Sequence, residues 1–185
     1  QGASLAAEWL ARTKRDQNRE AKRDEIVAAA RALFVEEGYE ATSMSRLATT
    51  AGVAPNTIYW YFQDKDEVLV AVLDNELSVR MAEYMQLSSM DHTERLLWVA
   101  NQLQRVSRLV GTVHSRLEKS PALEAWHARF HALSEEMLWA ELHQAGIAPE
   151  RIEALVKISV FTIEGLLVHQ LSEEQKRAIC AALIH

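Results

Sequence analysis

Two histidines on one predicted helix have the spacing of a metal-binding pair. His127 and His131 are four residues apart, which places both imidazoles on the same helix face. The residues between them include no glutamate that could serve as a general base beside a metal, and no third ligand is identifiable. We therefore expect no metal, no cofactor and no catalytic residue. An all-α metal-binding enzyme that uses His127 and His131 stays an alternative.

Aromatic side chains accompany these histidines in the C-terminal two-thirds of the chain. Such residues line cavities for small apolar ligands, although ordinary core packing explains the same pattern. If a pocket for a small molecule exists, we predict that its lining comes from Trp98, His114, Trp126, His127, Phe130, His131 and Trp139.

A second cluster, from Pro55 to Lys65, has the composition of a surface that binds nucleic acid. Short polar side chains at Asn56 and Thr57 would let the backbone approach base edges, and the aromatic run that follows ends in a lysine. No single face can bury the whole aromatic run. We expect Ile58 and Phe62 to point into the core, the tyrosines to point outward, and Trp60 to be undecided.

The charge distribution limits how the chain could meet nucleic acid. A net charge of −6 argues against a protein coated by nucleic acid on all sides. One stretch is basic, with Arg12, Lys14, Arg15, Arg19, Lys22 and Arg23. This stretch is either a solvated helix face or an N-terminal arm that contacts DNA phosphates.

The elements that would position these residues are predicted to be helices throughout, because no alternating strand pattern of useful length occurs. A helix over 19–37 ends at Gly38, and Ser43 offers an N-cap to a short helix over 44–50. Pro55 opens a third helix of about two turns, and Asp64 starts a fourth that runs to about residue 86. Further helices are predicted at 92–109, 112–118, 121–144, 149–170 and 173–184.

Two short helices joined by a glycine-containing turn and braced by a longer helix make a helix-turn-helix. We predict an N-terminal extension at 1–18, a DNA-binding domain at 19–65 and a helical second domain at 66–185. The single cysteine and the lack of an apolar run long enough for a membrane lead us to expect a cytoplasmic protein without membrane contact.

The short helices resemble the DNA-binding domain of the TetR/AcrR (tetracycline-repressor) family. The resemblance covers roughly 19–73 and is carried by several fixed spacings at once, namely Thr42-Ser43-Met44, Arg46-Leu47-Ala48, Ala51-Gly52-Val53, Thr57-Ile58-Tyr59-x-Tyr61-Phe62 and Asp64-Lys65. It implies DNA contacts from Ser43, Ser45, Arg46, Pro55, Asn56, Thr57, Tyr59, Trp60, Tyr61 and Lys65. One departure is Ala54, which removes a side-chain N-cap worth about 1 kcal/mol.

The last two predicted helices are apolar on more than one face, so they either fill the core or pack against another subunit. In the resembled family the equivalent helices form a two-fold interface, which implies a homodimer here. The interface residues that we expect are Val160, Phe161, Glu164, Leu167, Ile179 and Leu183.

The resemblance implies a repressor that binds a palindromic operator in double-stranded DNA and is released by a small, mainly hydrophobic effector. A helix-turn-helix regulator whose second domain binds a protein partner is the alternative.

Overall fold

The computed structural model describes the backbone of residues 2–185 and the side chains from Gln17 onward. Every regular element in this range is a helix, which confirms the predicted all-α class. The chain divides into two compact units, Gln1–Asp74 and Asn75–His185, and the division falls inside one continuous helix. The boundary that we predict between the DNA-binding domain at 19–65 and the second domain at 66–185 stays a prediction.

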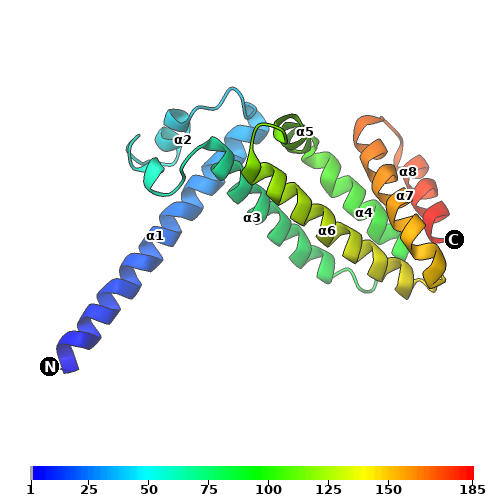
Figure 1. The fold of residues 1–185 in the computed structure, drawn as a ribbon, viewed down its shortest axis with the longest axis horizontal. Coiled ribbons are helices and arrows are strands. Elements are labelled where there is room, and N and C mark those ends of the chain that lie inside the picture. The colour runs from blue at the N-terminus through cyan, green and yellow to red at the C-terminus, as the bar shows by residue number, and fades with distance from the viewer. Residues whose placement is uncertain (1) are drawn as a thin grey trace. The chain divides into compact units, whose positions relative to one another are not determined.

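The first unit contains α1 (Gly2–Glu36), α2 (Met44–Thr50), η1 (Ile58–Trp60) and the beginning of α3 (Lys65–Met85) (Figure 1). Residues 5–18, whose conformation the sequence left open, continue α1 as helix. The side chains of Arg12, Lys14 and Arg15 lie outside the described residues. Gly38 ends α1 as predicted, since its φ of 91° is a conformation that other residues rarely adopt.

The core of the first unit is apolar and holds the short helices in place. Ile58 and Phe62 point inward as predicted, with 0% and 1% of their surface exposed. They are joined by fully or almost fully buried side chains from α1, α2 and α3, namely Ile26, Ala30, Phe34, Leu47, Ala48, Val68, Leu69 and Val72. Burial of each large side chain contributes about 1.5–3 kcal/mol, so the positions of α2 and η1 are well determined.

The predicted third helix is wrong in type. Residues 55–57 form a turn, and only Ile58–Trp60 are helical, as a 3₁₀ helix. The Thr57 N–H donates to the Ala54 carbonyl at 2.9 Å and the Trp60 N–H to the Thr57 carbonyl at 3.0 Å, so both bonds span three residues. A segment this short cannot recover the cost of nucleating an α-helix, and no side chain caps it.

The second unit contains the end of α3 and α4 (His92–Arg105), α5 (Ser107–Arg116), α6 (Pro121–Gln144), α7 (Pro149–Val168) and α8 (Glu173–Ile184). The predicted break between residues 109 and 112 is wrong. The chain leaves helical geometry at Val106, with φ −110° and ψ 22°, and Gly111 lies inside α5. No proline or glycine marks the true break, so the sequence held no local signal for it.

Helix α4 packs along α7 and α8, and α6 packs along α7 (Figure 1). The core between them is aliphatic, with Cys180 as its one sulfur-containing member. Its buried residues are Leu96, Leu97, Leu138, Leu142, Ile152, Val156, Cys180 and Ile184.

Among the described residues, none of the helices combines the length and the apolar character that a membrane crossing requires.

Candidate nucleic-acid interface

Ser43 begins α2 on the exposed side of the first unit. Its Oγ accepts a hydrogen bond from the Arg46 N–H at 3.0 Å, which confirms the predicted N-cap. Ser43, Ser45 and Arg46 are all exposed. The guanidinium of Arg46 bonds Glu37 at 2.8 Å, and this hydrogen bond and charge raise the pKa of Arg46. Contact of these side chains with DNA stays a prediction.

The segment after Gly52 presents its polar and aromatic side chains outward. Pro55 and Asn56 are exposed, Tyr59 has 56% of its surface exposed and Trp60 has 78%. Trp60 was the residue that the sequence could not orient. A tryptophan this exposed loses the benefit of burial, which makes it a candidate for contact with a partner.

Thr57 and Tyr61 are half-buried and flank these exposed residues. Burial of Ile58 and Phe62 on the opposite side of the same segment explains the arrangement. The inward pair anchors the segment, so the outward residues are held on a rigid backbone.

Lys65 lies at the start of α3 and is half-buried. Its Nζ donates to the Tyr39 carbonyl at 2.9 Å and lies 4.1 Å from the centre of the Tyr39 ring. Asp64 caps the same helix by accepting from the Glu67 N–H at 2.9 Å. The lysine is therefore held in a defined position, and its contact with a phosphate stays a prediction.

Two residues of the basic stretch, which we predict to be either a solvated helix face or an arm on DNA phosphates, lie beside this segment. Arg19 and Lys22 of α1 line a groove of about 570 Å³ together with Asn18, Thr57, Trp60 and Tyr61. The basic stretch around Arg19 is visible in the sequence. Its position beside η1 was not, because it depends on how α1 packs in the folded unit.

In the second unit, the structure brings three of the predicted pocket residues together. The His127 ring centre lies 5.3 Å from that of His114 and 4.3 Å from that of His131. Partial burial and the neighbouring His131 and His114 lower the pKa of His127, and Glu164 opposes this shift. The Nε2 atom of His127 is buried and has no hydrogen-bond partner among the described residues.

Of the predicted aromatic lining residues, Trp126 and Phe130 adjoin the three histidines, whereas Trp98 and Trp139 have other ring partners. Trp126 stacks on Phe130, with ring centres 5.2 Å apart, and Phe130 meets His131 edge-on at 6.1 Å. Trp98 lies near Tyr84, with ring centres 6.3 Å apart. Trp139 is 47% exposed and stacks on His143. A pocket shared by all of them stays a prediction.

Of the predicted interface residues, Phe161 belongs to an exposed apolar stripe on α7, whereas Ile179 and Leu183 lie on α8. Phe161 has 69% of its surface exposed, and Ile158 and Val168, which we did not predict, have 48% and 78%. Glu164 is exposed beside them, and the remaining predicted residues are half-buried, namely Val160, Leu167, Ile179 and Leu183.

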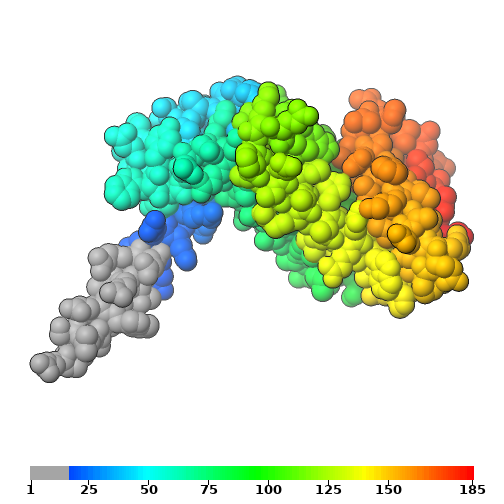
Figure 2. All heavy atoms as spheres, in the orientation of Figure 1, coloured from blue at the N-terminus to red at the C-terminus, as the bar shows by residue number. Residues whose placement is uncertain are grey.

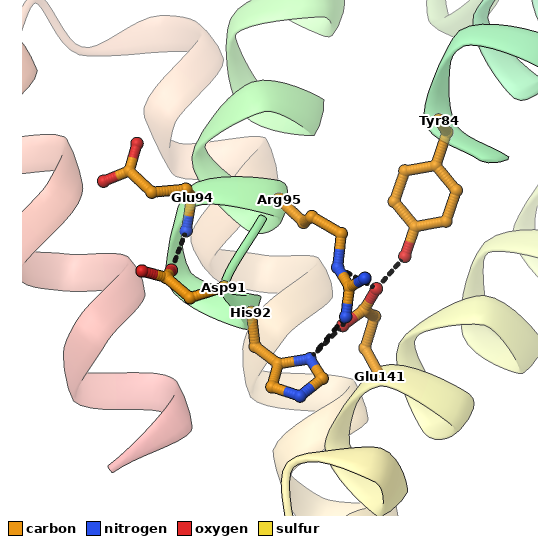
Figure 3. Close-up of polar contacts among 6 residues, drawn as sticks. All are labelled: Tyr84, Asp91, His92, Glu94, Arg95 and Glu141. Atoms are coloured by element: carbon orange, nitrogen blue, oxygen red, sulfur yellow. Dashed lines mark hydrogen bonds and ion pairs between the residues drawn. The ribbon is translucent and has the colours of Figure 1, made fainter. Parts of the chain in front are cut away.

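A buried polar network in the second unit was missed entirely (Figure 3). Glu141 is 6% exposed and lies among side chains from α3, α4 and α6. Its Oε1 lies 2.9 Å from Arg95 Nε, and its Oε2 lies 3.0 Å from Arg95 Nη2 and 2.5 Å from His92 Nδ1. The Tyr84 hydroxyl donates to Oε1 of the same carboxylate.

This network has two consequences. Burial and the carboxylate of Glu141 raise the pKa of the Tyr84 hydroxyl. The carboxylate also ties the C-terminal part of α3 to α4 and α6. The sequence did contain one signal, because Glu141 lies between Leu138 and Leu142 on an otherwise buried helix face.

Within the part of the chain whose side chains are described, no three His, Cys, Asp or Glu residues are arranged to hold a metal ion.

Comparison with known proteins agrees with the geometry of the first unit. Residues 26–72 match the family model of bacterial regulatory proteins of the tetR family. The regulator HbdR of Aromatoleum sp. (strain CIB) is 39% identical over 79 residues, which is 42% of this chain and 34% of that protein. The repressor AcnR of Corynebacterium diphtheriae is 34% identical over 91 residues, covering 45% and 47%. The chain thus spans between a third and a half of the length of these curated relatives.

Solved structures extend the likeness of the fold to both units. A transcriptional regulator from Rhodococcus sp. Rha1 superposes with a TM-score of 0.73 at 20% identity, over 88% of this chain and 93% of that one. A regulator from Saccharomonospora viridis, solved in complex with choline, has a TM-score of 0.74 at 16% identity, over 89% and 96%.

A helix-turn-helix with an outward polar and aromatic face defines a DNA-binding class of protein. Residues 26–72 of this chain belong to the tetR family of bacterial regulatory proteins. That family consists of regulators and not of enzymes.

Proposed function

We propose that this protein is a homodimeric transcriptional repressor that binds a palindromic operator and is released by a small, mainly hydrophobic effector. The observation that carries the proposal is the rigid outward face of the first unit. Exposed Asn56, Tyr59 and Trp60 stand over buried Ile58 and Phe62 within the segment that matches the family.

On this face, direct reading of bases falls to Asn56. An asparagine amide can donate to and accept from the edge of an adenine, and such a pair discriminates by about 1–3 kcal/mol. Thr57 contributes a second short polar side chain. Ser43, Tyr59, Tyr61 and Lys65 supply hydroxyl and ammonium donors for backbone phosphates, which fix the register without reading sequence.

A second copy of the chain would supply the other half of a palindromic site. One short recognition segment reads few bases, and pairs of such segments bind half-sites about one helical turn apart. The stripe of Ile158, Phe161 and Val168 on α7 is exposed in the single chain. Pairing across this stripe would remove it from water, and we place the dimer contact there.

The effector would bind in the second unit near His114, His127 and His131. The aromatic pair Trp126 and Phe130 offers apolar surface beside the three imidazoles. The choline complex of the Saccharomonospora viridis regulator supports a small organic molecule as the kind of effector. The effector would act by binding more tightly to a conformer whose two recognition segments no longer match successive major grooves.

Helix α3 is the element that could carry this change, because it runs unbroken from Lys65 to Met85. Its first residue belongs to the predicted DNA surface. Tyr84, near its other end, contacts Glu141 of α6.

The experiment is a selection of DNA. The purified full chain is incubated with duplexes that have a randomised central region, and the bound fraction is sequenced over successive rounds. We expect enrichment of an inverted repeat, and sedimentation of the complex should show two chains on each duplex. Bound duplexes without any enriched sequence would contradict the proposal, and so would a complex with a single chain.

A partner protein in place of a small effector is the remaining alternative. Release of the selected duplex by a small molecule alone would exclude it.

A further inference from the structure

Glu164 places a carboxylate on the exposed apolar stripe of α7, where we place the dimer contact. Phe161 and Val168, which lie next to it on the helix surface, have 69% and 78% of their surface exposed. The residues three and four positions away are the neighbours of a side chain on a helix, and here all of them are apolar, namely Val160, Phe161, Leu167 and Val168. Within one turn on either side of Glu164, α7 therefore offers this carboxylate no cation.

A second copy of the chain that covers the stripe would take the carboxylate of Glu164 out of water. Burial of an ionised carboxylate is strongly unfavourable unless a positive charge and hydrogen-bond donors accompany it. The apolar side chains around Glu164 supply neither. Formation of the dimer therefore requires a positive partner for Glu164 from another helix.

Imidazoles of α6 lie where such a partner is needed. Helix α7 follows α6 after a short turn and packs back along it, and in Figure 2 the orange atoms of α7 adjoin yellow atoms of α6. Lys157 Nζ donates to Glu135 Oε1 at 2.6 Å across the line where the two helices meet. About two turns further along α7 is Glu164, and about two turns back along α6 is His127, so both lie on this same line.

Three imidazoles gather at this place. The His127 ring centre lies 4.3 Å from that of His131 and 5.3 Å from that of His114 on α5. The titratable groups that act on His127 are these two imidazoles and Glu164, whose charge opposes the lowering of the His127 pKa. Because that pKa lies below 6.5, the imidazole of His127 is mostly neutral at pH 7 in the single chain.

The imidazoles can nevertheless accept a proton when a carboxylate is pressed against them. The Nε2 atom of His127 is buried and has no hydrogen-bond partner among the described residues, so an acceptor that reaches it would satisfy a polar atom that the single chain leaves unsatisfied. Groups this close titrate together, so an added proton belongs to the three imidazoles jointly.

We propose that dimerisation across the α7 stripe takes up one proton per protomer from solvent, which His114, His127 and His131 hold jointly as the positive partner of the buried Glu164. This inference rests on the proposed function, because it presumes the dimer contact on α7. A dimer that holds more protons than two separate chains is favoured by acid and weakened as the pH rises.

The proton uptake has a consequence for DNA binding and one for stability. A palindromic operator needs two copies of the chain, so the affinity of dilute protein for such an operator follows the same pH dependence. The acid-side loss of stability that the lowered pKa of His127 implies belongs to the single chain, and dimer formation opposes it.

The test measures the dissociation constant of the dimer by sedimentation of a dilution series of the full chain, at several values between about pH 5.5 and 8.5, where imidazoles titrate. Glu164→Gln removes the carboxylate and keeps the size of the side chain, and His127→Gln removes one imidazole. The matched control Glu136→Gln removes the same charge from an exposed position on α6. Circular dichroism at each pH confirms that every variant is folded.

A dimer too tight to dissociate on dilution is followed by its kinetics instead. Subunit exchange between two fluorescently labelled populations gives the dissociation rate at each pH for the same set of variants.

We expect the dissociation constant of the unmodified chain and of Glu136→Gln to be at least about tenfold higher at the alkaline end of this range than at the acid end, which corresponds to a difference of one pKa unit between dimer and single chain. Glu164→Gln should show almost no dependence on pH and should stay as tight as the unmodified dimer in acid, because it buries no charge. His127→Gln should reduce the dependence and weaken the dimer in acid. A role of Glu164 in packing alone would move none of these pH profiles.

A dissociation constant and an exchange rate of the unmodified chain that do not change with pH would overturn the inference. A pH dependence that persists in Glu164→Gln, or one that Glu136→Gln removes equally, would also overturn it. Each of these results leaves the proposed dimer and its operator intact. A chain that stays single at every pH and concentration would instead remove the proposed homodimer and this inference together.

Discussion

The two units use polar side chains in opposite ways. In the first unit the polar and aromatic residues that we assign to function are exposed and stand on an apolar core, as Asn56 and Trp60 do over Ile58 and Phe62. In the second unit a carboxylate is buried with its partners, as Glu141 is with Arg95. The first arrangement leaves binding surface open to a partner. In the second arrangement the buried polar groups bond one another and hold the helices together.

The comparison with known proteins follows the same division. The family model ends at residue 72, where the outward face and its supporting core are complete. Beyond it, the likeness to solved structures at 16–20% identity shows the fold alone. The first unit therefore contains the sequence that the chain shares with the family. In the second unit the chain shares the fold of the solved structures but little of their sequence.

The largest effect should come from breaking the buried pair. Glu141→Gln leaves the guanidinium of Arg95 in a site where that side chain is 10% exposed, so the free energy of unfolding should fall by about 3–5 kcal/mol. Chemical denaturation followed by circular dichroism measures it. Glu135→Gln, which breaks the exposed pair with Lys157, should cost less than about 1 kcal/mol.

A combined Arg95→Met and Glu141→Leu variant sharpens this test. Replacement of both charges by apolar groups should recover much of the lost stability, because no unpaired charge remains. If Glu141→Gln lowers the free energy of unfolding no more than Glu135→Gln does, the buried network does not hold the helices together. The proposed difference between the two units is then wrong.

On the exposed side, Asn56→Ala should leave stability nearly unchanged and relax base preference at one operator position by about 1–3 kcal/mol. Binding to duplexes that carry each of the four base pairs at every position measures this. Asn75→Ala, which changes the same residue type at an exposed position on α3, serves as the control. Preference that stays the same at all positions would exclude Asn56 as a base reader.

A smaller effect is expected at Tyr84, whose hydroxyl pKa is raised above its ordinary value of 10.0. The folded protein keeps the proton at a pH at which the unfolded chain loses it, so this stabilisation is complete below pH 10.0 and is lost as the pH rises further. Tyr84→Phe should cost about 1–2 kcal/mol at neutral pH and should reduce the alkaline loss of stability. An alkaline profile identical to that of the unmodified chain would show that Tyr84 ionises as freely as in the unfolded chain.

The smallest effect concerns His127, whose pKa is lowered from 6.5 by partial burial and by His131 and His114. The unfolded chain takes up a proton that the folded one resists, so stability should be lost as the pH falls below 6.5. His127→Gln should reduce this acid-side slope. The matched variant His169→Gln, at an exposed position, should not, and an equal change in both would contradict the assignment.

Spacing in the sequence predicted the end of α1, the position of α2 and the inward direction of Ile58 and Phe62, because the signals for these features are local. Caps, glycine turns and the alternation of Ile58 and Phe62 with outward residues act within a few residues of each other. The errors arose where local signals were absent or weak. No proline or glycine marks the break at Val106. Pro55 is typical of the first turn of an α-helix, but the helical segment that follows it is too short to form one.

The contacts of the second unit were harder to predict from the sequence, because the residues that form them are far apart along the chain. Glu141 meets His92 and Arg95 only after α4 and α6 have packed, and no spacing rule relates such positions. The same is true of the groove that Arg19 of α1 and Trp60 of η1 both line. His127 and His131 on α6 were found because their spacing is local, whereas no spacing rule shows that His114 on α5 lies beside His127.

The central claim is that the outward face of the first unit reads a DNA sequence. The most direct measurement compares the affinity of the full chain for the selected duplex with its affinity for a scrambled duplex of the same length and base composition, at one physiological salt concentration. The account predicts binding at least about a thousandfold tighter to the selected duplex. Equal affinity for the two duplexes would contradict it.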